Sequence, residues 1–318
     1  MAEKIENKQD EINWDDSLDY TYSSIKDTMF ETITFIEDRY RTKPKDEVIE
    51  TGIRWLEFCK EDLVVIGSRP AIGKTSFILS LISEFIINKN IPVGLVTPGT
   101  IERDIGIRLL AINSEIPIQK IRSGMMRIAE LKKVQEVSNV LFEAPLYFYD
   151  EPNCSFKNLK DNVLKMALEE HIQLLFIDGF KYIQEIIDAD TENYRIRLAK
   201  LLTELKSLAM ELHIPIILSL DLPATKNNEE PTIQDLRKNM IIADKADKIL
   251  FLHRNRLYDY RVNYQDAELI TIKNTAGPYG TFPLHFYPIP ASFLIKRTIK
   301  SENYHKMIAL CGIINKGV

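Results

Sequence analysis

Residues 67–75 read GSRPAIGKT, a combination of residue types that suits a loop binding phosphate groups. Glycine lets the backbone approach phosphates closely, and backbone N–H groups at the start of a helix attract anions. In such a loop Lys74 would reach the β- and γ-phosphates of ATP, and the Thr75 hydroxyl would bind Mg²⁺. The residues expected to bind the nucleotide are Ser68, Arg69, Pro70, Ala71, Ile72, Gly73, Lys74 and Thr75.

Ser68 departs from the general pattern of these loops, in which a second glycine stands at this position. One alternative is a strand-to-helix turn that contains Gly-Lys-Thr by chance. The context argues against this alternative, because the apolar run DLVVIG precedes the loop and a helical pattern follows it. We therefore predict a nucleotide-binding loop between a buried strand and a helix.

Asp178 is a second candidate, because it follows the four apolar residues of LLFIDGF. This places a carboxylate at the carboxyl end of a buried strand, where α/β sheets hold their ligands. Many buried strands end in a capping aspartate, so the signal is weak alone. Together with the upstream loop it predicts that Asp178 binds Mg²⁺, directly or through water, and takes part in catalysis.

Short apolar runs alternate with helical patterns after residue 62 and would position these candidates. The expected strands are residues 63–66, 93–97, 146–149, 174–178, 214–219, 248–252 and 269–272. The expected helices are residues 75–87, 102–112, 156–171 and 194–212. Continuously apolar strands separated by helices predict an α/β fold, with a twisted, mostly parallel sheet and helices on both faces. Turn residues in 274–290 predict an antiparallel hairpin at the sheet edge.

Composition sets the class of protein. The 318 residues are 45% hydrophobic and 27% charged, with net charge −5, which is ordinary for a globular protein and lacks the overall basic charge typical of nucleic-acid binding. No apolar run approaches the roughly 20 residues that a membrane span needs, and the N-terminus has no apolar secretory segment. Three scattered cysteines suit a reducing compartment, so we expect a cytoplasmic protein.

The chain before residue 48 differs from the rest. Residues 1–20 are polar and acidic, and we expect a mobile tail; residues 21–47 carry a helical apolar stripe at Ile25, Met29, Ile33, Ile36 and Tyr40. The stripe must be covered, either by its own domain or by a neighbouring subunit. We expect the main domain to span residues 48–300, followed by a tail at 301–318.

Several segments in collinear order resemble the C-terminal ATPase domain of DnaB-type replicative helicases, which are RecA-like motors. The loop of that family reads Arg-Pro-x-x-Gly-Lys-Thr, with a small residue where Ser68 stands. The other similar segments are RLLAINSEIPIQKIRSG, LLFIDGFKYI, LAKLLTELKSLAMELHIPIILSLDL, DLRKNMIIADKADKILFLHR and IKNTAGPYGT.

The resemblance implies a RecA-like fold, ATP and Mg²⁺ as cofactors, and a role in DNA replication. It also implies that residues 21–47 are a linker helix, which in that family packs on the adjacent subunit of a hexameric ring. This favours docking on a neighbour, either in a homo-oligomer or on a replicative helicase. The large N-terminal helical domain of the family has no counterpart in the sequence.

Three positions depart from the family at its catalytic residues. The glutamate that polarises the attacking water corresponds to Gly99, and Glu102 nearby suits a cap of the following helix. The arginine-finger position is Thr275, which leaves Lys273 as the cation that would reach a neighbour's γ-phosphate. The γ-phosphate-sensing glutamine corresponds to Asp221, which would repel phosphate unless a metal or lysine lies between them. We therefore expect ATP binding with impaired hydrolysis.

The segments expected to meet single-stranded DNA contain few cations. QEIIDADTENYR is acidic until Arg195, and PATKNNEEP offers only Lys226. DNA binding depends on cations that neutralise phosphates, so solvated acidic loops explain these segments at least as well. Two functions stay open: an active helicase motor translocating on single-stranded DNA, and a hydrolysis-dead accessory or regulator of a replicative helicase. Another RecA-like ATPase is a third, weaker alternative.

Overall fold

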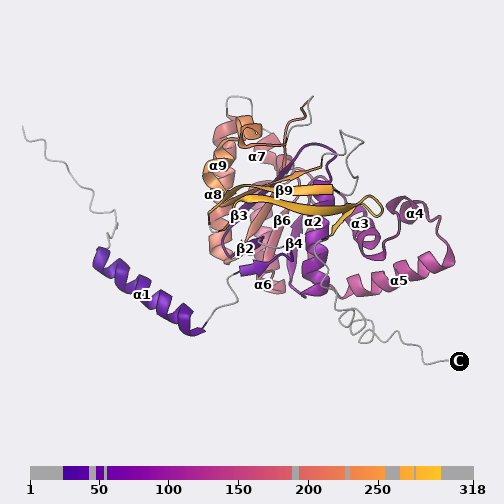
Figure 1. The fold of residues 1–318 in the computed structure, drawn as a ribbon, viewed down its shortest axis with the longest axis horizontal. Coiled ribbons are helices and arrows are strands. Elements are labelled where there is room, and N and C mark those ends of the chain that lie inside the picture. The colour runs from indigo at the N-terminus through magenta and orange to yellow at the C-terminus, as the bar shows by residue number, and fades with distance from the viewer. Residues whose placement is uncertain are drawn as a thin grey trace, which may run out of the picture. The chain divides into compact units, whose positions relative to one another are not determined.

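A computed structural model of the protein describes residues 24–42, 48–53, 56–187, 193–225, 230–254, 266–275 and 277–294. By compactness the chain divides into two units, Met1–Asp46 and Glu47–Val318, and each is described by itself (Figure 1). The two expected tails, residues 1–20 and 301–318, lie outside the described residues.

The first unit contributes one helix, α1 (Ile25–Thr42). Ser24 caps it, because its hydroxyl accepts a hydrogen bond from the backbone N–H of Asp27 at 3.2 Å. The apolar side chains of α1 are exposed, including Ile33 and Ile36 on the predicted stripe. The amphipathic helix expected in this segment is therefore present in the structure.

The second unit is built on a nine-stranded sheet with the order β11-β10-β9-β8-β3-β7-β6-β4-β5. The six strands from β8 to β5 are parallel, and β9, β10 and β11 extend one edge as antiparallel strands. The strands are β3 (Leu63–Ser68), β4 (Val93–Val96), β5 (Leu146–Tyr149), β6 (Leu174–Ile177), β7 (Ile216–Asp221), β8 (Lys248–His253), β9 (Asp266–Asn274), β10 (Gly280–Tyr287) and β11 (Ser292–Leu294). A separate two-stranded sheet pairs β1 (Val48–Glu50) with β2 (Glu57–Cys59).

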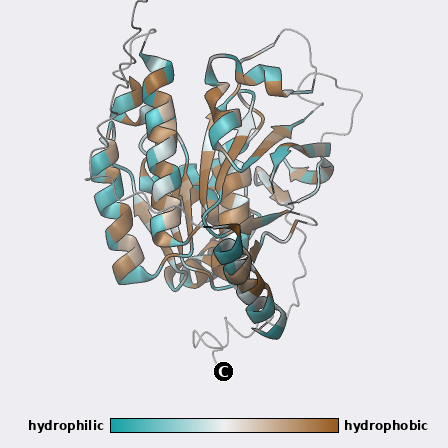
Figure 2. Cartoon of the chain, turned by 90° about the vertical axis from the view of Figure 1, so that its left-hand side faces the viewer, coloured by the Kyte–Doolittle hydropathy of each residue, from teal (hydrophilic) through white to brown (hydrophobic). Residues whose placement is uncertain are grey.

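Helices cover both faces of the large sheet, which creates two hydrophobic cores. Alternate residues of β3 point to opposite faces, so Val64 and Ile66 join one core while Leu63 and Val65 join the other. Figure 2 shows the hydrophobic strands of the sheet with helices of mixed hydrophobic and hydrophilic residues beside them. The helices of this unit are α2 (Lys74–Ser83), η1 (Glu84–Asn88), α3 (Glu102–Ser114), α4 (Ile118–Ser123), α5 (Ile128–Phe142), α6 (Phe156–Glu170), η2 (Phe180–Tyr182), α7 (Gln184–Ile187), α8 (Tyr194–Leu212), η3 (Ile233–Asn239) and α9 (Ile241–Lys245).

The predicted elements are all present, with small shifts at their ends. Strand β7 begins at Ile216 rather than residue 214, because the N–H of Ile214 donates to Ala209 at the end of α8 and Pro215 has no N–H. Strand β6 ends before Asp178, because Gly179 turns the chain with φ 107°. The predicted edge hairpin is confirmed as β9 and β10, which pair antiparallel. Helices α4, α5, α7 and α9 and strands β1 and β2 were not predicted.

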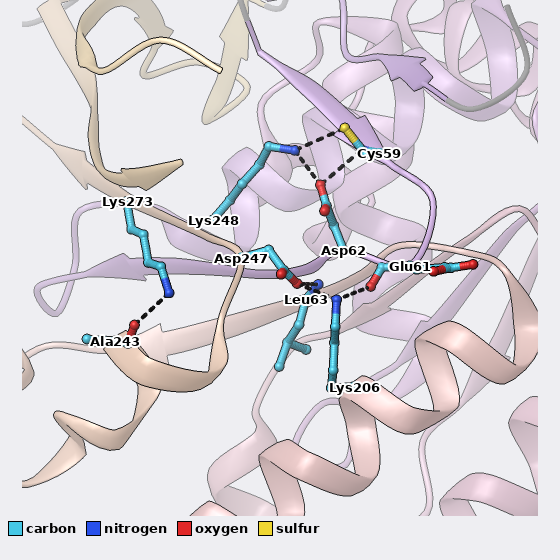
Figure 3. A network of polar contacts seen from close by, with 9 residues as sticks. All are labelled: Cys59, Glu61, Asp62, Leu63, Lys206, Ala243, Asp247, Lys248 and Lys273. Carbon is cyan, nitrogen blue, oxygen red and sulfur yellow. Dashed lines mark hydrogen bonds and ion pairs between the residues drawn. The ribbon is translucent and has the colours of Figure 1, made fainter. Parts of the chain in front are cut away.

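One buried ion pair and one partly exposed ion pair join the amino ends of the parallel strands (Figure 3). Lys248, at the start of β8, pairs with Asp62 just before β3, and their side chains are only 4% and 11% exposed. Asp247 accepts hydrogen bonds from the N–H of Leu63 and from Lys206 of α8, both at 2.8 Å. This network holds β3, β8 and α8 in register at the edge opposite the predicted nucleotide site.

No helix among the described residues combines the length and the apolar character that crossing a bilayer requires.

Candidate nucleotide-binding site

The sheet order brings the candidate residues other than Lys273 together at the carboxyl ends of the central parallel strands. Strands β3, β7, β6 and β4 are consecutive neighbours, and they run parallel. Their carboxyl ends lead into the GSRPAIGKT loop, Asp221, Asp178 and the turn with Gly99 respectively. Asp221 therefore stands between the loop and Asp178, an order that the local sequence does not reveal.

The loop has the backbone shape that phosphate binding needs. Gly73 has φ 108°, and a Cβ placed there would lie 3.3 Å from the Phe293 ring. Ala71 also has a positive φ, 65°. The side chains of Pro70 and Ala71 are exposed, whereas Ile72 is buried. The loop thus curls in front of the first turn of α2, whose free N–H groups favour an anion.

Thr75 and Asp178 lie together as the predicted Mg²⁺ ligands should. The Thr75 hydroxyl donates to Asp178 Oδ2 at 2.7 Å, across 103 residues of sequence. Lys74 Nζ lies 3.8 Å from Asp178 Oδ1. A hydroxyl and a carboxylate are oxygen ligands of the kind that Mg²⁺ prefers, so these residues fit the metal that a nucleotide would bring.

Asp221 contacts two lysines at this edge. Lys74 Nζ lies 2.9 Å from its Oδ1, and Lys181 of η2 pairs with its Oδ2. Burial raises the pKa of Asp221, but hydrogen bonds from Lys181 and Lys74 outweigh it and hold the pKa below the ordinary value. The hydrogen bond to Asp221 in turn raises the pKa of Lys181. Two lysines therefore contact Asp221, and the sequence had left a nearby lysine as a condition for phosphate binding beside this carboxylate.

Two arginines stabilise the loop through hydrogen bonds of their guanidinium groups. Arg69 is buried, and its guanidinium donates to Pro223 O at 2.8 Å and to both carboxylate oxygens of Asp235 at 3.1 and 3.3 Å. Arg254 donates to Ile72 O at 3.0 Å and stacks 3.5 Å from the Phe286 ring centre. The Arg69 side chain thus stabilises the conformation of the loop, and a phosphate would face the loop backbone rather than this side chain.

Tyr182 fills the space beside Gly99. A Cβ built on Gly99 would lie 2.6 Å from two carbon atoms of the Tyr182 ring, closer than real Cβ contacts come. Lys181 Nζ lies 5.0 Å from the centre of the same ring. At Gly99, where the sequence resemblance predicts the position of the catalytic glutamate, the Tyr182 ring packs against the glycine backbone.

Lys273 lies away from the loop of its own chain. It pairs with Ile249 at the beginning of β8, and Ile249 pairs with Val65, three residues or about 10 Å of strand before the end of β3. Its Nζ donates to Ala243 O at 2.8 Å (Figure 3). Thr275 follows it, with its N–H donating to Asp247 O at 3.2 Å. The structure does not bring Lys273 to Lys74 or Asp178.

Asp150 and Glu102 meet at the start of α3. Asp150, which follows β5, accepts a hydrogen bond from the backbone N–H of Glu102 at 3.3 Å. This contact agrees with the capping role expected for Asp150, and Glu102 itself lies in the first turn of α3, where an acid is favoured.

A family model described as "DnaB-like helicase C terminal domain" matches residues 51–294. The chain belongs to this family. The resemblance carried by the sequence segments above is thereby confirmed.

As a DnaB-like helicase C-terminal domain, the chain is 29% identical over 281 residues to "Replicative DNA helicase DnaB" of Treponema pallidum (strain Nichols), covering 87% of this chain and 62% of that protein. It is 26% identical over 274 residues to "Replicative DNA helicase DnaC" of Bacillus subtilis (strain 168), covering 83% and 60%. The chain thus spans about three fifths of the length of these relatives.

Two solved structures share the fold of this DnaB-like domain. The chain matches "The Structure Of A DnaB-Like Replicative Helicase And Its Interactions With Primase" with TM-score 0.73 and 20% identity, covering 86% of this chain and 67% of that one. It matches a second structure, described as an ATPase domain, with TM-score 0.72 and 20% identity, covering 86% and 99%. The predicted RecA-like α/β fold is confirmed.

Sequence reasoning missed four residues of this DnaB-like site: Lys181, Tyr182, Arg254 as a brace of the loop, and Asp235 as the partner of Arg69. The glycine directly after Asp178 was a usable signal, because Gly179 produces the tight turn that brings Lys181 and Tyr182 back over the site. Of the segments weighed as DNA contacts, QEIIDADTENYR and PATKNNEEP, residues 188–192 and 226–229 lie outside the described residues.

Proposed function

We propose that this DnaB-like domain binds ATP with Mg²⁺ and hydrolyses it slowly, within an assembly of DNA replication. The loop, Lys74, Thr75 and Asp178 would bind the nucleotide and its metal. When bound, Mg²⁺ would neutralise charge on the phosphate oxygens. Lys74 would bind the phosphates after leaving Asp221, and Thr75 and Asp178, which now share a hydrogen bond, would hold the metal.

The contact between Gly99 and Tyr182 carries the proposal of slow hydrolysis. Hydrolysis needs a group that orients and deprotonates water, and glycine offers none. The Tyr182 ring, 2.6 Å from where a Cβ of residue 99 would lie, occupies the space such a group would need.

The position of Lys273 supports an assembly in which a second copy of the chain contributes its Lys273 to the nucleotide site. Lys74 follows the carboxyl end of β3, whereas Lys273 lies beside the amino end of β8, so one chain cannot bring both to a single nucleotide. Lys273 would instead approach the nucleotide of a neighbouring subunit, after releasing Ala243 O. A lysine gives a point charge, whereas an arginine binds phosphate with two parallel hydrogen bonds.

Nucleotide binding and turnover together test this function. We expect the unmodified chain to bind ATP·Mg²⁺ and to turn it over far more slowly than a DnaB-type motor. We expect Lys74→Ala to weaken binding about tenfold or more, because it removes a charge-assisted hydrogen bond to phosphate. Fluorescent-nucleotide titration measures the binding, and phosphate release with and without oligo-dT measures the turnover.

Each outcome of that experiment decides between the functions. DNA-stimulated turnover at motor rates would establish the active helicase and remove the slow-hydrolysis proposal. Binding of ATP without turnover, with or without DNA, would favour the accessory or regulator. Absence of binding in the unmodified chain would refute a nucleotide-binding function altogether. Lys120→Ala is the control, because Lys120 pairs with Glu130 on α4 and α5, outside the site.

Helix α1 is proposed to dock on a neighbouring copy through its apolar stripe. We expect Ile33→Ser combined with Ile36→Ser to shift the protein from oligomer to monomer, because each substitution removes apolar area that docking would bury. Light scattering coupled to size-exclusion chromatography measures the mass. Glu31→Ser combined with Glu37→Ser is the matched control on the same helix. An unchanged mass for the isoleucine variant, or a monomeric unmodified chain, would contradict this role of α1.

A further inference from the structure

We propose that Lys181 determines specificity at this site: it neutralises Asp221 and so lets the site accept the terminal phosphate of a nucleoside triphosphate. The inference rests on the proposed nucleotide-binding function. It assigns Lys181 a task that concerns the γ-phosphate alone, whereas Lys74 and the loop act on diphosphates and triphosphates alike.

The placement of Asp221 creates the need for such a residue. Asp221 ends β7, where it pairs in register with Ser68, the residue that leads into the loop. The next N–H, that of Leu222, donates to Ser68 O at 2.8 Å. Asp221 is therefore fixed beside the loop, and its Oδ1 lies 2.9 Å from Lys74 Nζ. A γ-phosphate bound by Lys74 would stand next to this carboxylate, and like charges in that position repel.

The turn after β6 supplies the compensating cation. Gly179 has φ 107°, which folds the chain back at once, and its N–H donates to Ser219 Oγ of β7 at 2.9 Å. This turn places Lys181 above the end of β7, where its Nζ pairs with Asp221 Oδ2 and lies over the Tyr182 ring. Lys181 thus contacts the oxygen of Asp221 that Lys74 does not.

The formal charges of the aspartates and lysines in contact at this site sum to zero only when Lys181 is included. Asp178 and Asp221 contribute two carboxylates, and Lys74 and Lys181 contribute the two cations that contact them. With Lys181 present, Lys74 can leave Asp221 for phosphate and the carboxylate stays paired. Without Lys181, Asp221 would hold Lys74 and also repel the γ-phosphate. Both effects weaken ATP binding, and the second is absent for ADP.

The decisive variant is Lys181→Met, which keeps the apolar stem and removes the charge. We expect it to raise the Kd for ATP·Mg²⁺ about tenfold and the Kd for ADP·Mg²⁺ by no more than about threefold. Lys181→Arg should bind both nucleotides nearly as the unmodified chain does, because it keeps the cation. Fluorescent ATP and ADP analogues, titrated at one ionic strength, measure all of these constants.

A second substitution separates charge compensation from a structural role. Asp221→Asn removes the carboxylate, so Lys181→Met added to it should have less than about a threefold effect on ATP affinity. The midpoint of thermal unfolding should stay close to that of the unmodified chain in every variant, since the Lys181 and Asp221 side chains are 50% and 42% exposed and surface pairs contribute little.

Two results would overturn the inference while leaving nucleotide binding intact. One is an equal loss of ATP and ADP affinity in Lys181→Met. The other is a loss of ATP affinity that persists in the Asp221→Asn background. Failure of the unmodified chain to bind either nucleotide would overturn the proposed function itself, and the role of Lys181 with it.

Discussion

Gly99→Glu combined with Tyr182→Ala is expected to raise ATP turnover about 10²-fold over the unmodified chain, because it restores a general base and the space for it. Gly99→Glu alone is expected to leave turnover low. The φ of Gly99 lies outside the left-handed region, so the backbone accepts a side chain there. The obstacle is the Tyr182 ring, 2.6 Å from the new Cβ, which would have to move before the carboxylate could face a substrate.

The controls for this pair of substitutions distinguish the effect of the new carboxylate from the effect of the space opened for it. Tyr182→Ala alone, and Gly99→Gln combined with Tyr182→Ala, open the same volume without a carboxylate, and neither should raise turnover more than a few-fold. Phosphate release under saturating ATP·Mg²⁺ measures each variant, and Kd values confirm that binding is kept. A full gain in Gly99→Glu alone would show that Tyr182 is no obstacle. No gain in the double variant, with binding intact, would show that the slow step lies elsewhere, for instance at Thr275.

Lys248→Met is expected to lower the free energy of unfolding by about 3–5 kcal/mol, the largest change in stability expected for this chain. It would leave the Asp62 carboxylate buried with its N–H partner from Cys59 and without its cation. The pair joins the amino ends of β3 and β8, two adjacent central strands (Figure 3). Urea unfolding followed by circular dichroism measures the change.

A double-mutant cycle isolates the ion pair from the loss of the lysine stem. Lys248→Met with Asp62→Asn should be more stable than Lys248→Met alone, because asparagine leaves no unpaired charge and can still accept from the Cys59 N–H. Lys133→Met is the surface control, since Lys133 and Glu115 are 44% and 54% exposed and their pair should contribute less than about 1 kcal/mol. Equal effects of the buried and surface variants would show that the network does not stabilise the fold.

The parallel strands of the large sheet and helices α2, α3, α6 and α8 could be predicted because burial leaves a local pattern. Helix α8 was predicted with its observed bounds, since six apolar residues including Leu198 and Leu205 are buried along one side. Helix α5 was missed because its pattern is blurred: Val134, Val137 and Val140 are buried, but Ile128 and Phe142 on the same helix are exposed. Apolar residues on both sides of a helix hide its period of 3.6.

The candidate site was only partly predictable, because its decisive contacts join distant segments. Lys74, Thr75 and Asp178 were found from short motifs next to apolar runs, and the structure brings them together. The pairing of β7 between β3 and β6, which sets Asp221 beside the loop, follows from the order of strands and not from any local pattern. The approach of Tyr182 to Gly99 depends on the same order, since β6 and β4 are neighbours.

Arg69 and Arg254 hold the loop to the body of the domain through hydrogen bonds between the protein's own groups. Their guanidinium groups donate hydrogen bonds to Asp235, Pro223 O and Ile72 O, which belong to three separate segments. A chain segment fixed in this way has already lost its conformational entropy when the domain folds. A nucleotide would therefore meet a loop already positioned at Arg69 and Ile72, and the ordering of these two residues would not reduce its binding free energy.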